Sequence, residues 1–403
     1  MGLDRIVIVG ASLGGLRAAE ELRTQGFAGA VSIVGDEPHR PYDRPPLSKQ
    51  VLAGTRPPES TELTAASGPI DDLDLDWRLG QAASGLDLGE CAVLLAGGER
   101  LPYDGLVIAT GASPKRLPGT DHLEGVHTLR TIDDCAAIRA ALLAGPRRVA
   151  VVGAGFIGAE VASTCRGLGI EVSLIEALPV PLERGLGPTM GAVVADLHRD
   201  HGVDVRLGVG VVRIEGGDGV GRIRLTDGTL LEVDLVVIGI GVAPNTDWLE
   251  GSGLTIDNGV VCDGTCLAAP GVVAAGDVAR WPNRRFGEVM RVEHWDNAIA
   301  MGTHAARTLL AGPAAGPFEP VPWFWSDQYD RKIQLAGRAG PGDEVVVVSG
   351  SVEERRFVAF YGRAGRIVGV LGMSQPAKVM RWRALVEEGA SWESALAVAA
   401  TAG

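Results

Sequence analysis

Short apolar runs, each followed by glycines and then by a helical pattern, recur along this chain. The run Arg148–Val152 leads into a glycine-rich turn at 153–158, and apolar residues with helical spacing follow over Ala159–Gly167. A second apolar run, Val172–Ile175, ends on the acidic Glu176. A strand, a helix and a second strand in this order predict a βαβ unit with parallel strands.

The spacing of the glycines in this unit predicts a dinucleotide site. Gly153 permits a tight turn, Gly155 lets the backbone approach a pyrophosphate, and Gly158 lets the helix pack close to the sheet. Glu176 lies where an acidic side chain can bind the ribose hydroxyls of an adenosine. A glycine fingerprint alone is weak, but its place between strand, helix and terminal acid is specific. The expected contacts in this stretch are Gly153, Gly155, Phe156, Ile157, Gly158 and Glu176.

The N-terminus repeats the pattern. The strand-like run Arg5–Val9 is followed by a glycine-rich turn, a helical stretch and a second strand-like run, Val31–Val34. Serine stands where the middle glycine is expected, and it is small enough for close approach. Two such units predict two bound nucleotides, most simply a flavin and a nicotinamide. The contacts expected here are Gly10, Ser12, Gly14, Gly15, Asp36 and Glu37.

The last eighty residues have a different pattern. Strand-like runs at Glu344–Val348, Arg356–Tyr361 and Ile367–Leu371 precede helical stretches, and the proline-rich segment Pro313–Pro322 stands before them as a linker. Short strands followed by helices predict a small α+β domain.

Composition and charge narrow the class of protein. Of 403 residues, 46% are hydrophobic and 22% are charged, and the net charge of −13 disfavours nucleic acid as a partner. No apolar run approaches the roughly 18 residues of a membrane span, and no signal-peptide pattern opens the chain. The five cysteines are scattered and odd in number, as expected for reduced thiols. We therefore expect a cytoplasmic protein with no membrane or nucleic-acid partner and no metal site.

Five further runs carry a resemblance to a known family. They are PYDRPPLSK at 41–49, YDGLVIATG at 103–111, VVIGIGVAPN at 236–245, GVVAAGD at 271–277 and WFWSDQY at 323–329. In this order they resemble the FAD-dependent ferredoxin reductases, of the putidaredoxin-reductase type, that serve cytochrome P450 and ring-hydroxylating dioxygenase systems. Apoptosis-inducing factor shares the same architecture. The resemblance covers essentially the whole chain.

The resemblance implies an α/β fold with two Rossmann-like dinucleotide-binding domains, arranged as in glutathione reductase, and a small α+β C-terminal domain. The FAD-binding domain would be discontinuous, comprising residues 1–112 and 245–320. The NAD-binding domain would occupy residues 113–244, and the C-terminal reductase or interface domain would occupy 321–403.

The resemblance also implies further cofactor contacts. Asp277 would accept hydrogen bonds from the flavin ribityl chain, with Gly276 allowing close approach. The helix expected over Asn297–Leu310 would direct its N-terminus at the flavin. The further FAD contacts are Arg44, Lys49, Ala83, Thr110, Gly111, Arg130, Gly276, Asp277, Glu293, His294 and Trp295, and Glu160 and Gly241 would contact NAD.

Lys49 and Glu160 are the catalytic candidates that the resemblance implies. They would face each other near flavin N5, where a buried cation stabilises negative charge as hydride arrives and orients the nicotinamide. From the sequence alone, each is equally well a solvated surface charge.

The positions of the cysteines argue against the disulfide chemistry of related flavoproteins. Flavoprotein disulfide reductases carry a cysteine pair after the first nucleotide unit, whereas residues 36–60 contain no cysteine and Ser48-Lys49 stand there. The close pair Cys262 and Cys266 lies between two strands and is interpreted as structural. The leading hypothesis is therefore an NADH-dependent flavoprotein that passes single electrons to an iron–sulfur ferredoxin. A rubredoxin reductase or NADH oxidase, and a redox-sensing scaffold like apoptosis-inducing factor, remain as alternatives.

Charge guides the two remaining expectations. Glu176 would repel the 2′-phosphate of NADPH, so NADH is the expected donor. The segment Arg355–Arg383 holds seven basic residues and no acidic one, which predicts a docking face for an acidic ferredoxin. Trp325, Arg381 and Arg383 are the expected docking residues, on a monomer or weak homodimer.

Overall fold

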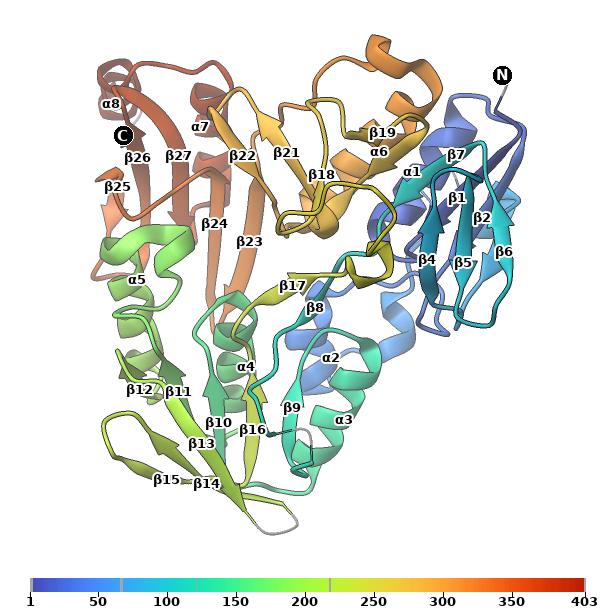
Figure 1. The fold of residues 1–403 in the computed structure, drawn as a ribbon. Helices are drawn as coiled ribbons and strands as arrows, with labels where there is room; N and C mark the ends of the chain where they lie inside the picture. The colour runs from blue at the N-terminus through green and yellow to red at the C-terminus, as the bar shows by residue number, and fades with distance from the viewer. Residues whose placement is uncertain (1–2, 66–67, 121, 217–218, 402–403) are drawn as a thin grey trace. The chain divides into compact units, whose positions relative to one another are not determined.

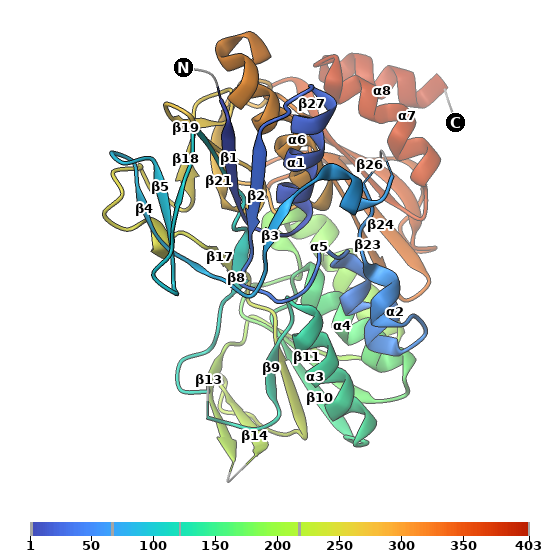
Figure 2. The ribbon, with the colours of Figure 1, turned by 90° about the vertical axis from the view of Figure 1, so that its right-hand side faces the viewer.

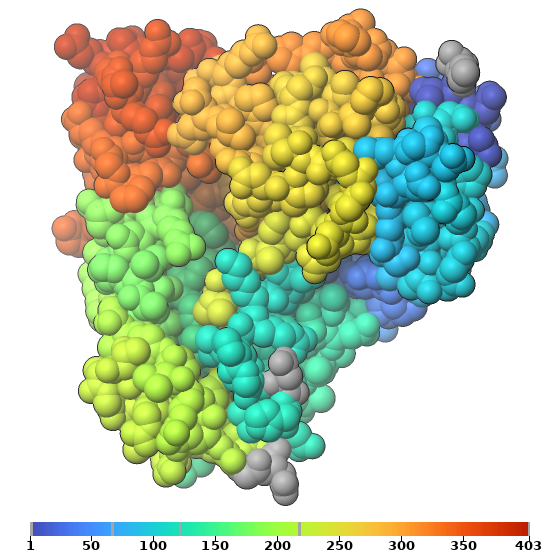
Figure 3. All heavy atoms as spheres, viewed as in Figure 1, coloured from blue at the N-terminus to red at the C-terminus, as the bar shows by residue number. Residues whose placement is uncertain are grey.

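A computed structural model describes residues 3–65, 68–120, 122–216 and 219–401, which Figure 3 colours by residue number. The chain folds into two compact units, and each collects segments that are far apart in the sequence. Unit 1 comprises Met1–Asp43, Thr61–Ser113 and Ala243–Pro322. Unit 2 comprises Arg44–Ser60, Pro114–Val242 and Trp323–Gly403. The finer division into FAD, NAD and C-terminal domains stays a prediction.

Unit 1 is built on a mostly parallel sheet with the strand order β19-β20-β7-β1-β2-β3 (Figure 1). Its central strand β1 (Arg5–Val9) pairs in parallel with β2 (Ala30–Val34) and β7 (Gly105–Ile108). These strands are almost continuously apolar because both faces of a parallel sheet are covered. The outer strands are β3 (Asp76–Arg78), β20 (Val272–Ala274) and the antiparallel β19 (Leu267–Ala269).

Two helices of unit 1 pack closely against each other. α1 (Leu13–Thr24) and α6 (Trp295–Ala311) lie side by side in Figures 1 and 2. A Cβ added to Gly302 of α6 would lie 2.4 Å from the carbonyl oxygen of Gly14, so only glycine allows this approach. The helix predicted over Asn297–Leu310 is confirmed and begins two residues earlier.

Smaller sheets complete unit 1. One contains β4 (Ala83–Asp87), β5 (Ala92–Leu95) and β6 (Arg100–Pro102), and another contains β18 (Val260–Val261), β21 (Ala279–Asn283) and β22 (Glu288–Met290). The chain passes between the units within β8 (Ala112–Pro114) and β17 (Val242–Pro244).

Unit 2 contains a second parallel sheet, with the order β12-β11-β10-β16-β9. Its strands are β9 (Val126–Thr128), β10 (Arg148–Val152), β11 (Glu171–Glu176), β12 (Asp204–Leu207) and β16 (Leu235–Ile238). The helices of this part are α2 (Gln50–Ala53), α3 (Ile132–Leu143), α4 (Phe156–Gly167) and α5 (Glu183–Asp200). An antiparallel sheet of β13 (Val211–Gly216), β14 (Val220–Leu225) and β15 (Leu230–Glu232) accompanies them.

The C-terminal part of unit 2 is an antiparallel sheet with the order β23-β24-β27-β26-β25, followed by two helices (Figure 1). The strands are β23 (Trp323–Gln328), β24 (Arg331–Gly337), β25 (Glu344–Ser351), β26 (Arg356–Arg363) and β27 (Arg366–Met373), and the helices are α7 (Pro376–Glu387) and α8 (Trp392–Thr401). One face packs against α5, with Phe324 and Ile333 in the same core cluster as Leu186 and Met190.

These sheets confirm the predicted α/β fold with two parallel nucleotide-type sheets and an α+β C-terminal part. The predicted strands at 344–348, 356–361 and 367–371 are all present and run longer than predicted. Over the ranges that the structure describes, no helix is both long enough and apolar enough to cross a membrane.

Candidate functional site

The glycine turn of unit 2 lies at the carboxyl end of β10. Gly153 has a φ of +97°, and a Cβ there would lie 2.4 Å from the carbonyl oxygen of Gly239. A Cβ on Gly158 would lie 2.0 Å from the oxygen of Gly153, so the helix contacts its own turn. At Gly155, by contrast, the nearest atom to a Cβ is 3.8 Å away. The turn is therefore tight on its sheet side and open at Gly155, where a phosphate needs access.

The turn of unit 1 follows the same plan. Gly10 has a φ of +128°, and a Cβ there would lie 2.1 Å from the oxygen of Ala109. A Cβ on Gly15 would lie 2.0 Å from the oxygen of Gly10. The serine that replaces the middle glycine, Ser12, is the N-cap residue of α1 in extended conformation.

The two helices behind these turns begin without a side-chain cap. Within the described chain, the Ser12 side chain makes no capping hydrogen bond to α1, and the N-cap residue of α4, Gly155, has no side chain that could make one. In α3, by contrast, Thr131 and Asp134 form a complete capping box. The first N–H groups of α1 and α4 point out of the helix as a positive end, which is the arrangement that binds a pyrophosphate. The residues present therefore fit two dinucleotides.

Glu176 ends β11 beside the glycine turn. Its Oε2 accepts a hydrogen bond from the backbone N–H of Ala154 at 2.7 Å, and its Oε1 accepts one from Leu178 N–H at 2.9 Å. A carboxylate has about four acceptor positions. Glu176 is therefore fixed at the turn and keeps acceptor capacity for ribose hydroxyls.

Lys49 and Glu160 form a buried ion pair in unit 2. Lys49 Nζ lies 2.8 Å from Glu160 Oε2, and the side chains are 11% and 4% exposed. Glu160 lies in α4, two residues after Gly158 of the glycine turn. Lys49 follows the 3₁₀ turn Pro45–Ser48, which the prolines of this loop favour. The pair is therefore not two solvated surface charges.

Two serines complete the environment of this carboxylate. Ser48 Oγ donates to Glu160 Oε2 at 2.5 Å, and Ser326 Oγ of β23 donates to Oε1 at 2.8 Å. Both serines are buried, at 2% and 0% exposure. Ser48 and Ser326 lie within the PYDRPPLSK and WFWSDQY motifs, but the motifs did not predict a role for either. Ser326 could have been found from the alternation of side chains along β23, because this alternation places the polar Ser326 on the same buried face as the apolar Phe324.

The FAD contacts expected from the sequence divide between the units. Thr110, Gly111 and Asn245 meet in unit 1, where Thr110 Oγ1 donates to the oxygen of Asn245 at 2.8 Å. In unit 2, Arg44 donates to the carbonyl oxygen of Arg130 at 2.7 Å. Unit 1 holds Gly10, Ser12, Gly14, Gly15, Asp36, Glu37, Ala83, Thr110, Gly111, Gly276, Asp277, Glu293, His294 and Trp295, and unit 2 holds Arg44, Lys49 and Arg130.

Near the end of the parallel sheet of unit 1, Asp277 follows β20 and is 9% exposed. Gly276 before it has a φ of +76°. Trp295 begins α6, and its Nε1 donates to Asp43 Oδ1 at 2.7 Å. Glu293 forms an ion pair with Arg291 at 2.7 Å. These residues lie in one unit, and their contacts with a flavin stay predictions.

The expected NAD contacts all lie in unit 2. Phe156, the first residue of α4, packs against Phe324 with 4.4 Å between ring centroids. Ile157 beside it is 45% exposed, an unusual fraction for isoleucine and one that suits a ligand-facing position. Gly241 follows β16 with a φ of +97°, and a Cβ there would meet nothing within 4 Å.

The cysteines lack the features of a redox relay. Four are buried, and Cys91 is exposed. Burial raises the pKa of Cys135 to about 11 and that of Cys165 and Cys262 to about 12, and it raises the pKa of Cys266 as well. A thiol reacts as its thiolate, so these four are unreactive at neutral pH. Across the described ranges, no three His, Cys, Asp or Glu side chains cluster in a way that could hold a metal ion.

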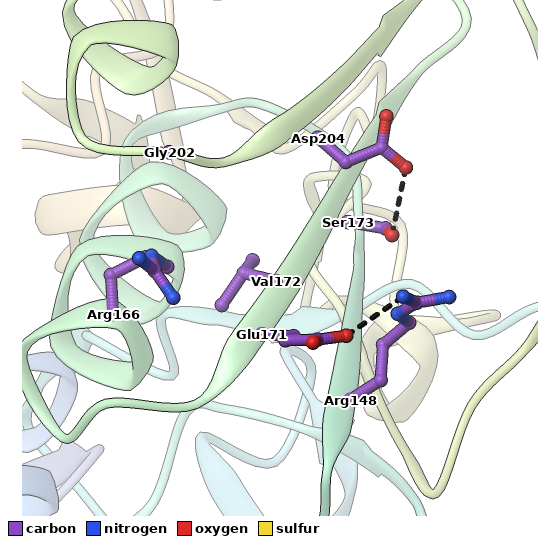
Figure 4. Close-up of a pocket in the computed structure, with 7 residues that line it drawn as sticks. All are labelled: Arg148, Arg166, Glu171, Val172, Ser173, Gly202 and Asp204. Atoms are coloured by element: carbon purple, nitrogen blue, oxygen red, sulfur yellow. Dashed lines mark hydrogen bonds and ion pairs between the residues drawn. The ribbon is translucent and has the colours of Figure 1, made fainter.

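A pocket lies at the amino ends of three parallel strands of unit 2 (Figure 4). It is lined by Arg148, Glu171 and Asp204, the first residues of β10, β11 and β12. Dinucleotides bind at the carboxyl ends of such strands, and this pocket lies at the amino ends. It is therefore separate from the candidate nucleotide site.

Of the expected docking residues, Arg383 is partly neutralised by Glu387, whose Oε1 lies 2.8 Å from its Nε. Arg381 is exposed on α7 beside Met380, which is 49% exposed. Trp325 stacks on Trp323 with 5.2 Å between ring centroids.

Comparisons with known proteins agree with this geometry. Residues 4–302 match the model of the pyridine nucleotide-disulphide oxidoreductase family, and residues 323–402 match the reductase C-terminal family. Rhodocoxin reductase of Rhodococcus erythropolis is 36% identical over 94% of this chain and 89% of its own length. The ferredoxin reductase subunit of 5,5′-dehydrodivanillate O-demethylase from a Sphingobium species is 39% identical, covering 95% and 93%.

A solved structure resembles the whole fold. The reductase in a covalent putidaredoxin reductase–putidaredoxin complex is 33% identical and covers 96% of this chain and 93% of its own, with a TM-score of 0.90. The resemblance inferred from the sequence motifs is thereby confirmed. Two glycine turns with uncapped helices, the matched family models and this structural likeness lead to one conclusion. This chain belongs to the pyridine nucleotide-disulphide oxidoreductase family and carries its reductase C-terminal domain.

Proposed function

We propose that this protein is a flavoprotein ferredoxin reductase that uses NADH. Relatives at 36–39% identity over nearly the whole chain are named as reductases of rhodocoxin or ferredoxin. FAD supplies the conversion of a two-electron hydride transfer into single-electron transfers to an iron–sulfur protein.

The observation that carries the proposal is the buried Lys49–Glu160 pair. It stands after the first nucleotide unit, where a disulfide reductase carries paired cysteines, and no cysteine occurs in residues 36–60. The chain therefore offers no second redox group there to take electrons from a flavin. An external one-electron acceptor fits this arrangement.

The chain's own groups would bind and orient both cofactors. The turn at Gly10–Gly15 and the start of α1 would hold the FAD pyrophosphate, and the turn at Gly153–Gly158 and α4 would hold that of NADH. Glu176 would bind the adenosine ribose. Lys49, held by Glu160, supplies a fixed positive charge that favours the transfer of hydride.

The finer features of the partner also belong to this proposal. We place the docking face of an acidic ferredoxin on α7, around Arg381, with Arg383 and Trp325 contributing. Arg381 is an exposed cation on a protein whose net charge is −13, so it would attract an acidic partner locally.

The test uses purified, FAD-loaded protein and two acceptors. With NADH, it should reduce ferricyanide directly and cytochrome c only when a ferredoxin is added. Rapid oxygen consumption without ferredoxin would instead identify an NADH oxidase. A fully reduced flavin that neither acceptor reoxidises would identify a redox-sensing scaffold and contradict the proposal.

A further inference from the structure

Buried polar side chains lead away from Glu160 into the interior of unit 2. Ser326 Oγ donates to Glu160 Oε1 at 2.8 Å, and Gln328 Nε2 donates to Ser326 Oγ at 3.1 Å. Ser326 and Gln328 are both 0% exposed. They are two residues apart on β23 and therefore share one face of the sheet.

His198, in the last turn of α5, is the next link. It is 0% exposed, and its Nδ1 lies 2.7 Å from the hydroxyl oxygen of Tyr329. Burial lowers the pKa of His198 to about 4, with His201 adding to the effect, while the Gln328 side chain opposes it. His198 is therefore neutral at pH 7 and carries a single ring proton.

The position of that proton follows from the neighbouring groups. Over the residues that the structure describes, His198 Nε2 and Gln328 Oε1 are buried and have no hydrogen-bond partner. The amide oxygen can only accept, so a proton on Nε2 directed at Gln328 would give both atoms a partner. Nδ1 then accepts from the Tyr329 hydroxyl, and burial raises the pKa of Tyr329, which keeps its proton.

With this tautomer, all the hydrogen bonds point the same way. Gln328 donates to Ser326 and Ser326 to Glu160, and with the proton on Nε2 Tyr329 would donate to His198 and His198 to Gln328. Hydrogen bonds in such a series polarise one another, so the last donor binds the carboxylate more strongly than an isolated serine would.

We propose that Gln328 and His198 are positioning residues that act through Ser326 to fix the orientation of the Glu160 carboxylate. One oxygen of Glu160 accepts from Ser48 and Lys49, and the other accepts from Ser326. The carboxylate cannot rotate without losing one of these bonds, so Lys49 is held in one place. This inference rests on the proposed function, because it concerns the ion pair assigned to hydride transfer.

The tautomer of His198 can be measured without any turnover. In FAD-loaded protein labelled with ¹⁵N-histidine, the signals of His198 are identified among those of seven histidines by their loss in His198→Gln. We expect a neutral ring with its proton on Nε2 at every pH from about 5.5 to 8. A proton on Nδ1 would reverse the chain at this link and overturn the inference.

A second measurement tests the effect on the ion pair. Gln328→Leu keeps a similar volume and removes the hydrogen bond that the amide donates to Ser326. In anaerobic stopped-flow, reduction of the flavin by NADH should slow about fivefold, the factor that one lost hydrogen bond of about 1 kcal/mol gives. The Kd of NADH should stay within about twofold, because the expected loss is in the transition state and not in substrate binding.

The control and the double variant separate positioning from packing. Gln334→Leu removes another buried glutamine of the same sheet, on the opposite face, and should leave the rate unchanged. In Lys49→Met, which should itself be about tenfold to a hundredfold slower, adding Gln328→Leu should cause no further loss. If Gln328→Leu does not fold, Ser326→Ala replaces it.

Two results would contradict different claims. A Gln328→Leu variant that reduces as fast as the parent would overturn the positioning role and leave the proposed function intact. A Lys49→Met variant as fast as the parent would instead overturn the role of Lys49 itself.

Discussion

At the scale of single residues, Glu176 should select the nicotinamide donor. A 2′-phosphate adds about −1.5 to −2 charges, and one repulsion at about 4 Å is worth at most about 4 kcal/mol at an effective dielectric of 20. The kcat/KM for NADH should exceed that for NADPH, and Glu176→Gln should reduce the ratio at least about tenfold. Glu171→Gln, at the other end of β11, is the matched control. An unchanged ratio in Glu176→Gln would contradict this role.

His198 should make stability depend on pH. Its pKa is about 4 in the folded protein, because of burial and then of His201, and about 6.5 when unfolded. Between these two pKa values, the histidine binds a proton in the unfolded chain but not in the folded protein. The contribution of the neutral, buried His198 to the free energy of unfolding is therefore fully present above pH 6.5 and is lost as the pH falls through 4. The loss is about 3 kcal/mol. Between pH 7 and 4, the parent should lose more stability in urea than His198→Gln, whose His201 and Tyr329 are unchanged. Parallel losses would contradict the prediction.

Individual residues also show what the sequence could not predict. The hydrogen bonds from Gln328 through Ser326 to Glu160 join β23 to α4, and the Gln328 side chain affects the pKa of His198 in α5, although these elements are far apart in the sequence. No spacing rule connects them, so only the folded chain brings them together. The glycine turns, by contrast, were predictable because each depends on sterics within one short segment.

At the scale of secondary-structure elements, the contact between α1 and α6 should depend on Gly302. A Cβ there would lie 2.4 Å from the Gly14 backbone, so Gly302→Ala should lower the free energy of unfolding by about 1–3 kcal/mol. Gly167→Ala is the control, because nothing lies within 4 Å of a Cβ there, and helix propensity should make it neutral or up to about 1 kcal/mol stabilising. Equal urea midpoints for the two variants would refute the close packing.

The basic segment Arg355–Arg383 shows a limit of reading charge along the chain. It contains no acidic residue, yet Arg355 pairs with Asp200 of α5 at 3.0 Å and Arg363 pairs with Asp343 at 2.6 Å. The neutralising carboxylates come from other parts of the sequence. The positive surface is therefore smaller than the count of arginines indicates, and Arg381 is its most exposed described member on α7.

At the scale of the whole molecule, electron transfer should require docking of a ferredoxin. Arg381→Glu/Arg383→Glu should raise the KM for ferredoxin, while reduction of ferricyanide is unchanged. Activity through ferredoxin should also fall steeply with salt, because the Debye length shrinks from about 10 Å at 0.1 M to about 3 Å at 1 M. The control is Arg100→Glu/Arg284→Glu, which makes the same change in net charge at two exposed positions of unit 1. An equal rise of KM in both double variants would place the docking face elsewhere.

Both half-reactions of the proposed electron transfer can be followed in one anaerobic stopped-flow experiment. The FAD-loaded protein is mixed with one equivalent of NADH and then with an excess of oxidised iron–sulfur ferredoxin. We predict rapid bleaching of the flavin, followed by its reoxidation with two ferredoxins reduced per NADH. A flavin that NADH reduces but ferredoxin leaves reduced would contradict the assignment as a ferredoxin reductase.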